Sequence, residues 1–289
     1  MKRTRQSTTR SKKYKPAGPG PRIVIFTDLD GTLLSAETYE PGPSLEALRQ
    51  CRKLQIPVIF VSSKTRAEME RLRKELDNSD PFVSENGGGV FLPRETWEKP
   101  QGFVEGGNYW SLWIGVPHAA ILKALDAAVK RCSARIERFS SMSIDRIMER
   151  TGLSPDEARL ARMREFDEPF LIHDQSDKII TGLKQEIRKA GFNLTRGGRF
   201  YHVMGGCDKG KAVRRIMDLY RGLNPDVCFA AVGDAENDLP MLLEADLPFL
   251  VRKPDGEYDK AAVLNRVIIT QGIGPQGFYE AVRNIITNS

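Results

Sequence analysis

Residues 22–32 read RIVIFTDLDGT, and this short stretch decides the fold class. Its first six residues, Arg22–Thr27, form a β-branched, apolar run of the kind found in strands that are buried on both faces. The run stops abruptly at Asp28, and Asp30 and Gly31 follow at once. We therefore predict a buried strand that delivers two carboxylates to its C-terminal end.

Strand and helix signals alternate after this first strand. A helical stretch begins at Ser44, and its apolar residues recur with a helical period. A strand at 58–61, a charged helix at 66–76 and a short strand at 81–84 are expected next. The alternation resumes later with a helix at 209–219, a strand at 227–232 and a helix at 239–244. Since parallel strands need crossover connections, the pattern predicts an α/β fold with a doubly wound parallel sheet.

The alternation weakens over residues 88–202. Aromatic residues are scattered there, and Ser154 precedes Pro155 in a pattern typical of a helix start. We interpret 88–202 as an inserted α/β cap domain. The core is then built from two separated pieces of chain, 22–87 and 203–289.

The basic charge is concentrated at the N-terminus. The chain has a net charge of +6, but residues 1–15 hold seven Lys and Arg and no acid, so the remainder carries −1. We expect residues 1–21 to be a disordered tail, because such a composition cannot bury apolar surface. Nucleic acid is therefore an improbable partner, apart from a weak polyanion contact through this tail.

The cysteines and the hydropathy of the chain indicate the cellular compartment in which the protein is expected. The four cysteines show no metal-ligand spacing and no CxxC pair, which favours reduced thiols. The chain has no apolar run long enough for a membrane span and no apolar secretory signal at its N-terminus. We expect a cytoplasmic protein; the sequence leaves its oligomeric state open.

Acidic and hydroxyl residues follow three of the predicted strands. They are Asp28 with Asp30, Ser62, and Asp234 with Asp238. Ligands of open α/β sheets bind beyond the carboxyl ends of the strands, so these side chains are expected to converge. Hard oxygen ligands in this number suit Mg2+ bound together with a substrate phosphate.

The same residues suggest how a phosphate ester could be cleaved. Asp28 can attack phosphorus once a cation offsets the charge repulsion, and Asp30 can exchange protons with the leaving oxygen and with water. Lys209, which precedes a predicted helix, is suited to hold the phosphoryl charge.

This ordered set resembles the haloacid dehalogenase-like phosphatase superfamily. The signature residues are DLDGT at 28–32, Ser62, Lys209 and GDAEND at 233–238, in the order typical of that family. The resemblance implies Asp28 as nucleophile and Asp30 as acid/base. It also implies a Mg2+ site formed by Asp28, Asp30, Asp234 and Asp238, and a cap of the C2 type.

Four strings look more narrowly like the mannosyl-3-phosphoglycerate phosphatase family. They are VSSKTRAE at 61–68, SENGG at 84–88, REFDEPF at 164–170 and TRGGRFYH at 195–202. That resemblance implies release of phosphate from a small phosphorylated sugar-acid substrate, giving the compatible solute mannosylglycerate. The substrate-binding residues it suggests are Ser62, Ser63, Lys64, Glu85, Asn86, Arg164, Glu168, Arg196, Gly198, Arg199 and His202.

Several alternatives remain open. Asp238 also suits the N-cap of the helix from Leu239, Arg164 and Glu168 could pair within the cap, and His202 could be structural. Another sugar-phosphate phosphatase or a phosphomutase would use the same core residues. A polyanion-binding protein acting through the basic tail is the alternative from a different functional class.

Overall fold

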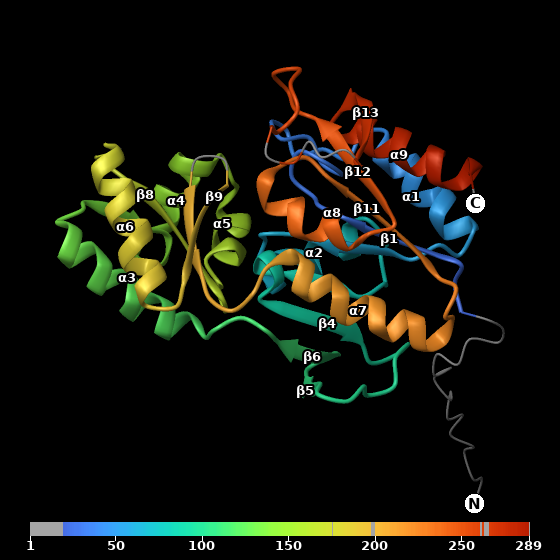
Figure 1. The fold of residues 1–289 in the computed structure, drawn as a ribbon, viewed down its shortest axis with the longest axis horizontal. Helices are drawn as coiled ribbons and strands as arrows, with labels where there is room; N and C mark the ends of the chain where they lie inside the picture. The colour runs from blue at the N-terminus through green and yellow to red at the C-terminus, as the bar shows by residue number, and fades with distance from the viewer. Residues whose placement is uncertain (1–19, 175, 198–199, 261, 263–265, 289) are drawn as a thin grey trace, which may run out of the picture.

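The computed structural model describes residues 20–174, 176–197, 200–260, 262 and 266–288. Two α/β bodies are joined by two chain crossings, and the body that contains both ends of the described chain is the larger (Figure 1). The predicted tail at 1–21 lies almost wholly outside the described residues. Its last two residues, Gly20 and Pro21, are described, and both carbonyls accept hydrogen bonds from the Asn224 side chain. Within the described part of the chain, no helix is long and apolar enough to cross a membrane.

The larger body is built on a nine-stranded sheet of order β13-β12-β11-β1-β2-β3-β4-β6-β5. The six strands from β13 to β3 are parallel, as predicted, and β4, β6 and β5 extend the sheet antiparallel. The strands are β1 (Ile23–Thr27), β2 (Val58–Val61), β3 (Phe82–Ser84), β4 (Gly89–Pro93), β5 (Val104–Gly106), β6 (Tyr109–Trp113), β11 (Cys228–Gly233), β12 (Leu247–Arg252) and β13 (Ile268–Ile273).

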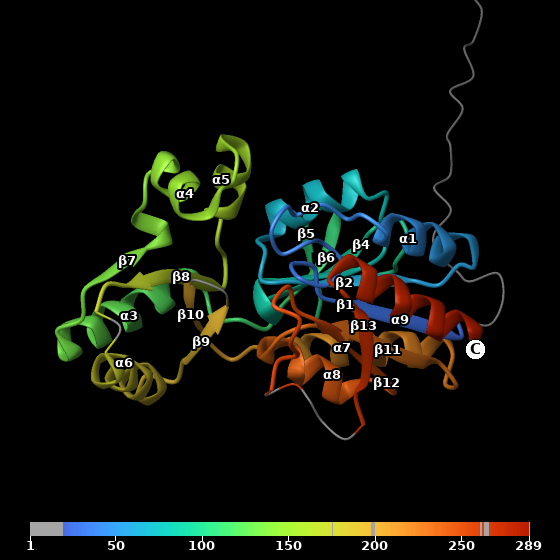
Figure 2. The same cartoon turned by 90° about the horizontal axis from the view of Figure 1, so that it is seen from above.

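Helices cover both faces of this sheet, with a separate apolar cluster under each layer (Figure 2). One layer consists of α1 (Ser44–Lys53), α2 (Arg66–Glu75) and α9 (Pro275–Thr287). The other consists of α7 (Lys209–Leu223) and α8 (Leu239–Glu244). Residues of β1 alternate between the two clusters, Ile25 on one side and Phe26 on the other, because successive side chains of a strand point to opposite faces.

The smaller body is a four-stranded antiparallel sheet of order β7-β8-β10-β9. Its strands are β7 (Ile136–Arg138), β8 (Asp167–Ile172), β9 (Asn193–Gly197) and β10 (Phe200–Met204). One face is packed against α3 (His118–Cys132) and α6 (Asp177–Lys189). On the other side lie α4 (Ile144–Thr151) and α5 (Pro155–Ala161), and α5 approaches α2 of the larger body (Figure 2).

The predicted boundaries of the insertion differ from the observed sheets. We expected the insertion to span 88–202, but β4, β5 and β6 belong to the larger sheet and β10 continues to Met204. The loss of βα alternation at Gly88 therefore marks a change to antiparallel pairing, which needs only short turns, and not a domain boundary. The insertion that carries the second sheet runs from about 114 to 204; we call it the cap and the larger body the core.

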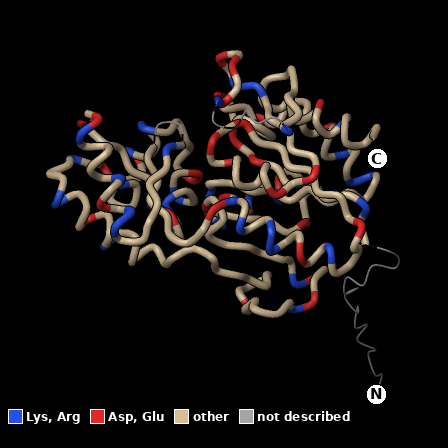
Figure 3. The backbone as a smooth tube through the Cα atoms, viewed as in Figure 1, with Lys and Arg blue, Asp and Glu red and all other residues tan. Residues whose placement is uncertain are grey.

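Basic and acidic residues are interspersed along the backbone of the core and of the cap (Figure 3). This agrees with the net charge of −1 outside the first 15 residues.

Candidate active site

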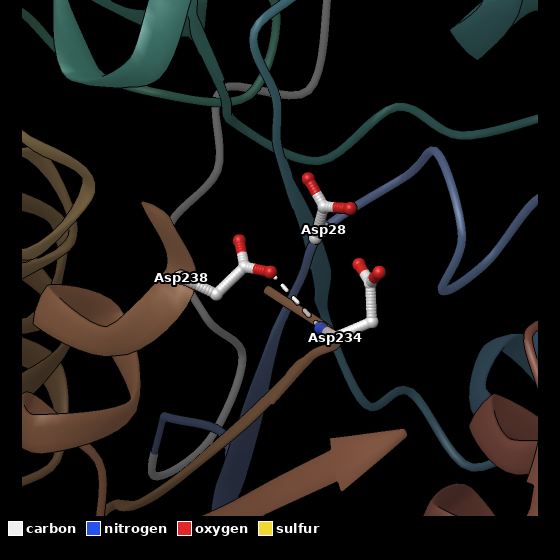
Figure 4. Close-up of side chains that lie close together, drawn as sticks. All are labelled: Asp28, Asp234 and Asp238. Atoms are coloured by element: carbon white, nitrogen blue, oxygen red, sulfur yellow. Dashed lines mark hydrogen bonds between the residues drawn. The ribbon is translucent and has the colours of Figure 1, made fainter. Parts of the chain in front are cut away.

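Three strand ends meet at one edge of the core sheet. β1 pairs with β11 on one side and β2 on the other, so the residues after these strands, Asp28, Asp234 and Ser62, are brought together. Carboxylate oxygens of Asp28, Asp234 and Asp238 lie within 4.8 Å of one another, and all three residues are buried (Figure 4). The predicted convergence of these acids is confirmed.

Lys209 lies inside this acidic cluster. Its Nζ is 2.5 Å from Asp28 Oδ1 and 2.5 Å from Asp238 Oδ1, and its side chain is fully buried. Lys209 is the first residue of α7, and Asp208 caps that helix by accepting the Lys211 N–H at 2.8 Å. The helix start thus fixes the lysine backbone while two carboxylates fix its ammonium group.

Two glycines allow the close approaches that form the site. Gly31 has φ +90°, and a Cβ there would lie 2.8 Å from Asp234 Oδ2. Gly87 has φ +101°, and a Cβ there would lie 2.2 Å from the Asp208 carbonyl oxygen. Any side chain at either position would push the loops apart, so DLDGT and SENGG need glycine at these points.

Asp238 has no free carboxylate oxygen. Oδ1 accepts from Lys209, while Oδ2 accepts the backbone N–H of Asp234 at 3.0 Å and of Ala235 at 3.1 Å. Figure 4 shows this carboxylate turned toward the Asp234 backbone nitrogen. Its side chain makes no cap bond to α8; instead it closes the turn that carries Asp234.

Negative charge exceeds positive charge in this cluster. Burial raises the pKa of Asp28 to about 7, with repulsion from Asp238 adding to the effect and Lys209 opposing it. Burial, followed by Asp238 and Asp28, raises the pKa of Asp234 well above its usual value. Asp234 also accepts the Thr32 hydroxyl at 3.1 Å. A buried set of hard carboxylate oxygens with one lysine fits a divalent cation, which would relieve the repulsion.

Asp30 lies beside the cluster and is held by a different lysine. Its Oδ2 is 2.9 Å from Lys64 Nζ, while its Oδ1 is buried and has no hydrogen-bond partner among the described residues. Two further predicted site residues, Ser62 and Asn86, follow the neighbouring strands β2 and β3 and are held by hydrogen bonds to backbone groups. Ser62 Oγ accepts the Lys64 N–H at 3.2 Å, and the Ser62 carbonyl accepts the Asn86 N–H at 2.9 Å.

Two predicted substrate residues connect core and cap instead of facing open space. The Glu85 carboxylate accepts the backbone N–H groups of Glu165 and Phe166, at 2.7–3.1 Å. Arg164 donates to the Ser63 carbonyl at 2.7 Å and lies 3.4 Å from Asp167. Burial raises the pKa of Glu85 to about 7, although Arg164 opposes the rise. Both side chains are buried at the boundary between the two bodies.

The remaining predicted cap residues occupy opposite faces of the cap sheet. Glu168 accepts from Ser140 N and Oγ, both at 2.9 Å, and lies 2.5 Å from His118 Nε2. His202 Nδ1 is 2.7 Å from Asp167 Oδ2, and Arg196 stacks over the Tyr201 ring at 5.4 Å. Gly198 and Arg199 lie outside the described residues.

The sequence reasoning missed the partners His118, Ser140 and Asp167. Asp167 stands inside the quoted string REFDEPF, next to Glu168. Strand alternation at this point would have indicated that the two acids point to opposite faces and need separate partners. His118 and Ser140 carry no such local signal.

Comparisons with known proteins identify the family to which this chain belongs. The family model for haloacid dehalogenase-like hydrolases matches residues 25–99 and 169–263. A glucosyl-3-phosphoglycerate/mannosyl-3-phosphoglycerate phosphatase of Methanococcoides burtonii is 40% identical, over 91% of this chain and 97% of its own length. A protein of the same name from Persephonella marina is 35% identical over the same shares. The mannosyl-3-phosphoglycerate phosphatase of Pyrococcus furiosus is 35% identical, over 79% of this chain and 90% of its own length.

Solved structures share the fold at lower identity. A Thermoplasma acidophilum protein superimposes with a TM-score of 0.64 at 20% identity, over 92% of this chain and 97% of its own. A haloacid dehalogenase-like hydrolase from Bacteroides thetaiotaomicron gives a TM-score of 0.64 at 18% identity, over 92% of this chain and all of its own. The chain belongs to the haloacid dehalogenase-like hydrolase family, and its relatives place it in the glucosyl-3-phosphoglycerate/mannosyl-3-phosphoglycerate phosphatase group of that family.

Proposed function

We propose that this protein hydrolyses mannosyl-3-phosphoglycerate, or its glucosyl counterpart, to the glycosylglycerate and inorganic phosphate through a phosphorylated Asp28. The observation that carries the proposal is the buried cluster of Asp28, Asp234 and Asp238 around Lys209. The substrate follows from the three relatives, whose names specify these phosphoglycerate esters.

Asp28 would be the nucleophile. Its carboxylate forms a bond to phosphorus while the bond between phosphorus and the leaving oxygen breaks, and Asp30 gives that oxygen a proton. In the second half, Asp30 takes a proton from water as the water attacks phosphorus. Asp28 is released as a carboxylate together with inorganic phosphate. Lys209 offsets charge on the phosphoryl oxygens throughout, and Ser62 would bind one of them.

Mg2+ is the proposed cofactor. Asp28 and Asp234 would hold it through carboxylate oxygens, and Asp30 would contribute its backbone carbonyl oxygen, which leaves its carboxyl group for proton transfer. Asp238 would act indirectly, because both of its oxygens are used by Lys209 and the turn. When bound, Mg2+ supplies positive charge that lets an anionic phosphate approach an anionic nucleophile.

The cap would recognise the sugar and acid portions of the substrate. Arg196, Arg199 and His202 are the candidates for this contact, with Gly198 allowing close backbone approach. Ser63, Lys64, Glu85, Asn86, Arg164 and Glu168 remain candidates by resemblance, but the described side-chain contacts of Glu85, Arg164 and Glu168 are to protein groups. Seating of the cap on the core would exclude bulk water from the phosphorylated aspartate.

We place the reaction in the cytoplasm. Cys51, Cys132, Cys207 and Cys228 are all described and all free thiols, which suits a reducing compartment.

The test is release of phosphate from synthetic mannosyl- and glucosyl-3-phosphoglycerate, with Mg2+ or with a chelator, beside a panel of sugar monophosphates. We expect metal-dependent release with preference for the two phosphoglycerate esters. Preference for sugar monophosphates would contradict the proposed substrate but not the proposed phosphatase mechanism. Transfer of phosphate to a second sugar position would indicate a phosphomutase. If no ester released phosphate, the proposal that this protein is a phosphatase would be wrong.

A further inference from the structure

Lys64 contacts Asp30, although the sequence suggested a substrate contact for it. Its Nζ is 2.9 Å from Asp30 Oδ2, and the lysine side chain is 15% exposed. The group that faces Asp30 is therefore the ammonium group of a largely buried lysine, paired with one carboxylate oxygen.

The two carboxylate oxygens of Asp30 have different surroundings. Oδ2 is occupied by Lys64, while Oδ1 is buried and has no hydrogen-bond partner among the described residues. A buried oxygen without a partner is unfavourable unless another molecule supplies one. A carboxyl group held at one oxygen also cannot rotate freely, so the free oxygen keeps a fixed direction.

The backbone around Lys64 is fixed at three points. Its N–H donates to Ser62 Oγ at 3.2 Å, its carbonyl accepts the Glu85 N–H at 3.0 Å, and the preceding carbonyl of Ser63 accepts from Arg164 at 2.7 Å. Two of these partners, Glu85 and Arg164, also link core and cap. The loop that carries Lys64 is thus held directly by the contacts that seat the cap.

We propose that Lys64 is a positioning residue for Asp30: it holds Oδ2 so that Oδ1 exchanges the proton with the leaving oxygen, and seating of the cap fixes this arrangement. The inference rests on the proposed role of Asp30 as acid/base. In the first half-reaction, neutral Asp30 accepts from Lys64 at Oδ2 and gives the Oδ1 proton to the leaving oxygen. In the second, Oδ1 takes a proton from the attacking water. Lys64 keeps its own protons in both.

The test compares two leaving groups. An alkoxide such as glycerate needs a proton as it leaves, whereas 4-nitrophenolate is a stable anion and does not. Because kcat/KM reports the steps up to formation of the phosphorylated Asp28, it isolates the acid role of Asp30. We expect Lys64→Met to lower kcat/KM about 10- to 100-fold on the phosphoglycerate ester. This is at most the lower end of the roughly 10^2- to 10^4-fold contribution of general acid catalysis, because Asp30 itself is retained. On 4-nitrophenyl phosphate the loss should be less than about threefold.

Further variants separate positioning from binding. Lys64→Arg should recover part of the loss, since it retains a cation at Oδ2. Once Asp30→Asn is present, adding Lys64→Met should change kcat/KM less than about threefold, because a positioning residue acts only through its partner. The matched control is Lys189→Met on α6, which removes a cap lysine paired with Glu186 and should leave both substrates unaffected.

Other results would overturn the proposal. A rise in KM on the phosphoglycerate ester at unchanged kcat would make Lys64 a substrate ligand, and an equal loss on both esters would exclude a role through the leaving oxygen. If Lys64→Met does not fold, Lys64→Gln, which also removes the cation, provides the same comparison. Failure of the proposed function is separate: either the unmodified enzyme releases no phosphate, or Asp30→Asn retains full activity on the alkoxide ester.

Discussion

The acids at the core strand ends and the acids of the cap sheet are equally buried but differently neutralised. In the core, Asp28 and Asp238 contact the ammonium group of Lys209, and Asp234, whose carboxylate lies close to both, accepts the Thr32 hydroxyl. In the cap, the single carboxylate of Glu168 accepts two hydrogen bonds from Ser140 and contacts His118. A buried carboxylate is stabilised where hydrogen-bond donors satisfy its negative charge. Where several carboxylates have too few donors and cations, their pKa values are perturbed, and such clusters are typical of functional sites. The comparison separates the proposed reaction site in the core from a structural ion network in the cap.

The largest effect is expected from Asp28→Asn. We expect turnover to fall at least about 10^4-fold, because the amide cannot form the covalent intermediate. The melting temperature should stay equal or rise, since the change removes one of three mutually repelling buried charges. Phosphate release and thermal unfolding measure the two effects.

The control is Asp218→Asn, which changes an exposed acid of α7 paired with Arg221. A clear loss of stability in Asp28→Asn would mean that the charge excess at the strand ends is smaller than the geometry indicates.

Binding of Mg2+ should stabilise the core in a pH-dependent way. The pKa of Asp28 is raised to about 7, so in metal-free protein its contribution to stability is present at low pH and lost as pH rises through about 7. The pKa of Asp234 is also raised, and its contribution is likewise lost as pH rises. Mg2+ competes with these protons. At a concentration 100 times its Kd it should add about 2.7 kcal/mol at pH 8 and clearly less at pH 6.

Thermal unfolding with Mg2+ or a chelator at both pH values measures this difference. Asp234→Asn should lose most of the stabilisation, while Asp218→Asn should retain it. An equal shift at pH 6 and pH 8 would contradict metal binding at the carboxylate cluster.

The core site was predictable because its chemistry is encoded locally. A strand followed at once by Asp28 and Asp30 places both acids at a sheet edge, and parallel topology brings Asp234 to the same edge. The sheet extension was missed for a related reason: once β3 is followed by the antiparallel β4, no helix marks the connection. A domain boundary predicted from the loss of βα alternation therefore falls too early in the chain.

The cap contacts were not predictable in the same way. Glu85 meets the backbone of Phe166, 81 positions later, and Arg164 meets the Ser63 carbonyl, 101 positions earlier. A sequence shows which residues are charged and not which backbone groups lie beside them after folding. Whether Glu85, Arg164 or Glu168 also touches substrate remains a prediction.

Glu168→Ala should give the opposite signature to Asp28→Asn. Removing the carboxylate leaves the Ser140 donors and His118 without their partner, which should destabilise the protein by about 2 kcal/mol. The folded fraction should keep kcat within a few fold. Guanidinium chloride unfolding and phosphate release measure the two quantities.

Its control is Glu149→Ala, which removes an exposed acid of α4; its ion-pair partner, Arg146, also pairs with Glu137. A large loss of kcat in Glu168→Ala with unchanged stability would move Glu168 from the scaffold to the reaction site.

Glu85 is intermediate between the core acids and Glu168, and its substitution should give the smallest change of the variants considered. It has backbone donors from Glu165 and Phe166, as a scaffold residue does, yet burial raises its pKa to about 7 from a reference of 4.5. Because the folded value is the higher one, its contribution to stability is present below about pH 4.5 and lost as pH rises through about 7. Glu85→Gln cannot titrate, so the free energy of unfolding should depend less on pH between 5.5 and 6.5, by about 1 kcal/mol. Unfolding free energies at the two pH values measure the change, with Glu149→Gln as control. An unchanged pH dependence in Glu85→Gln would mean that the carboxylate stays ionised at the boundary of core and cap, held as firmly as Glu168.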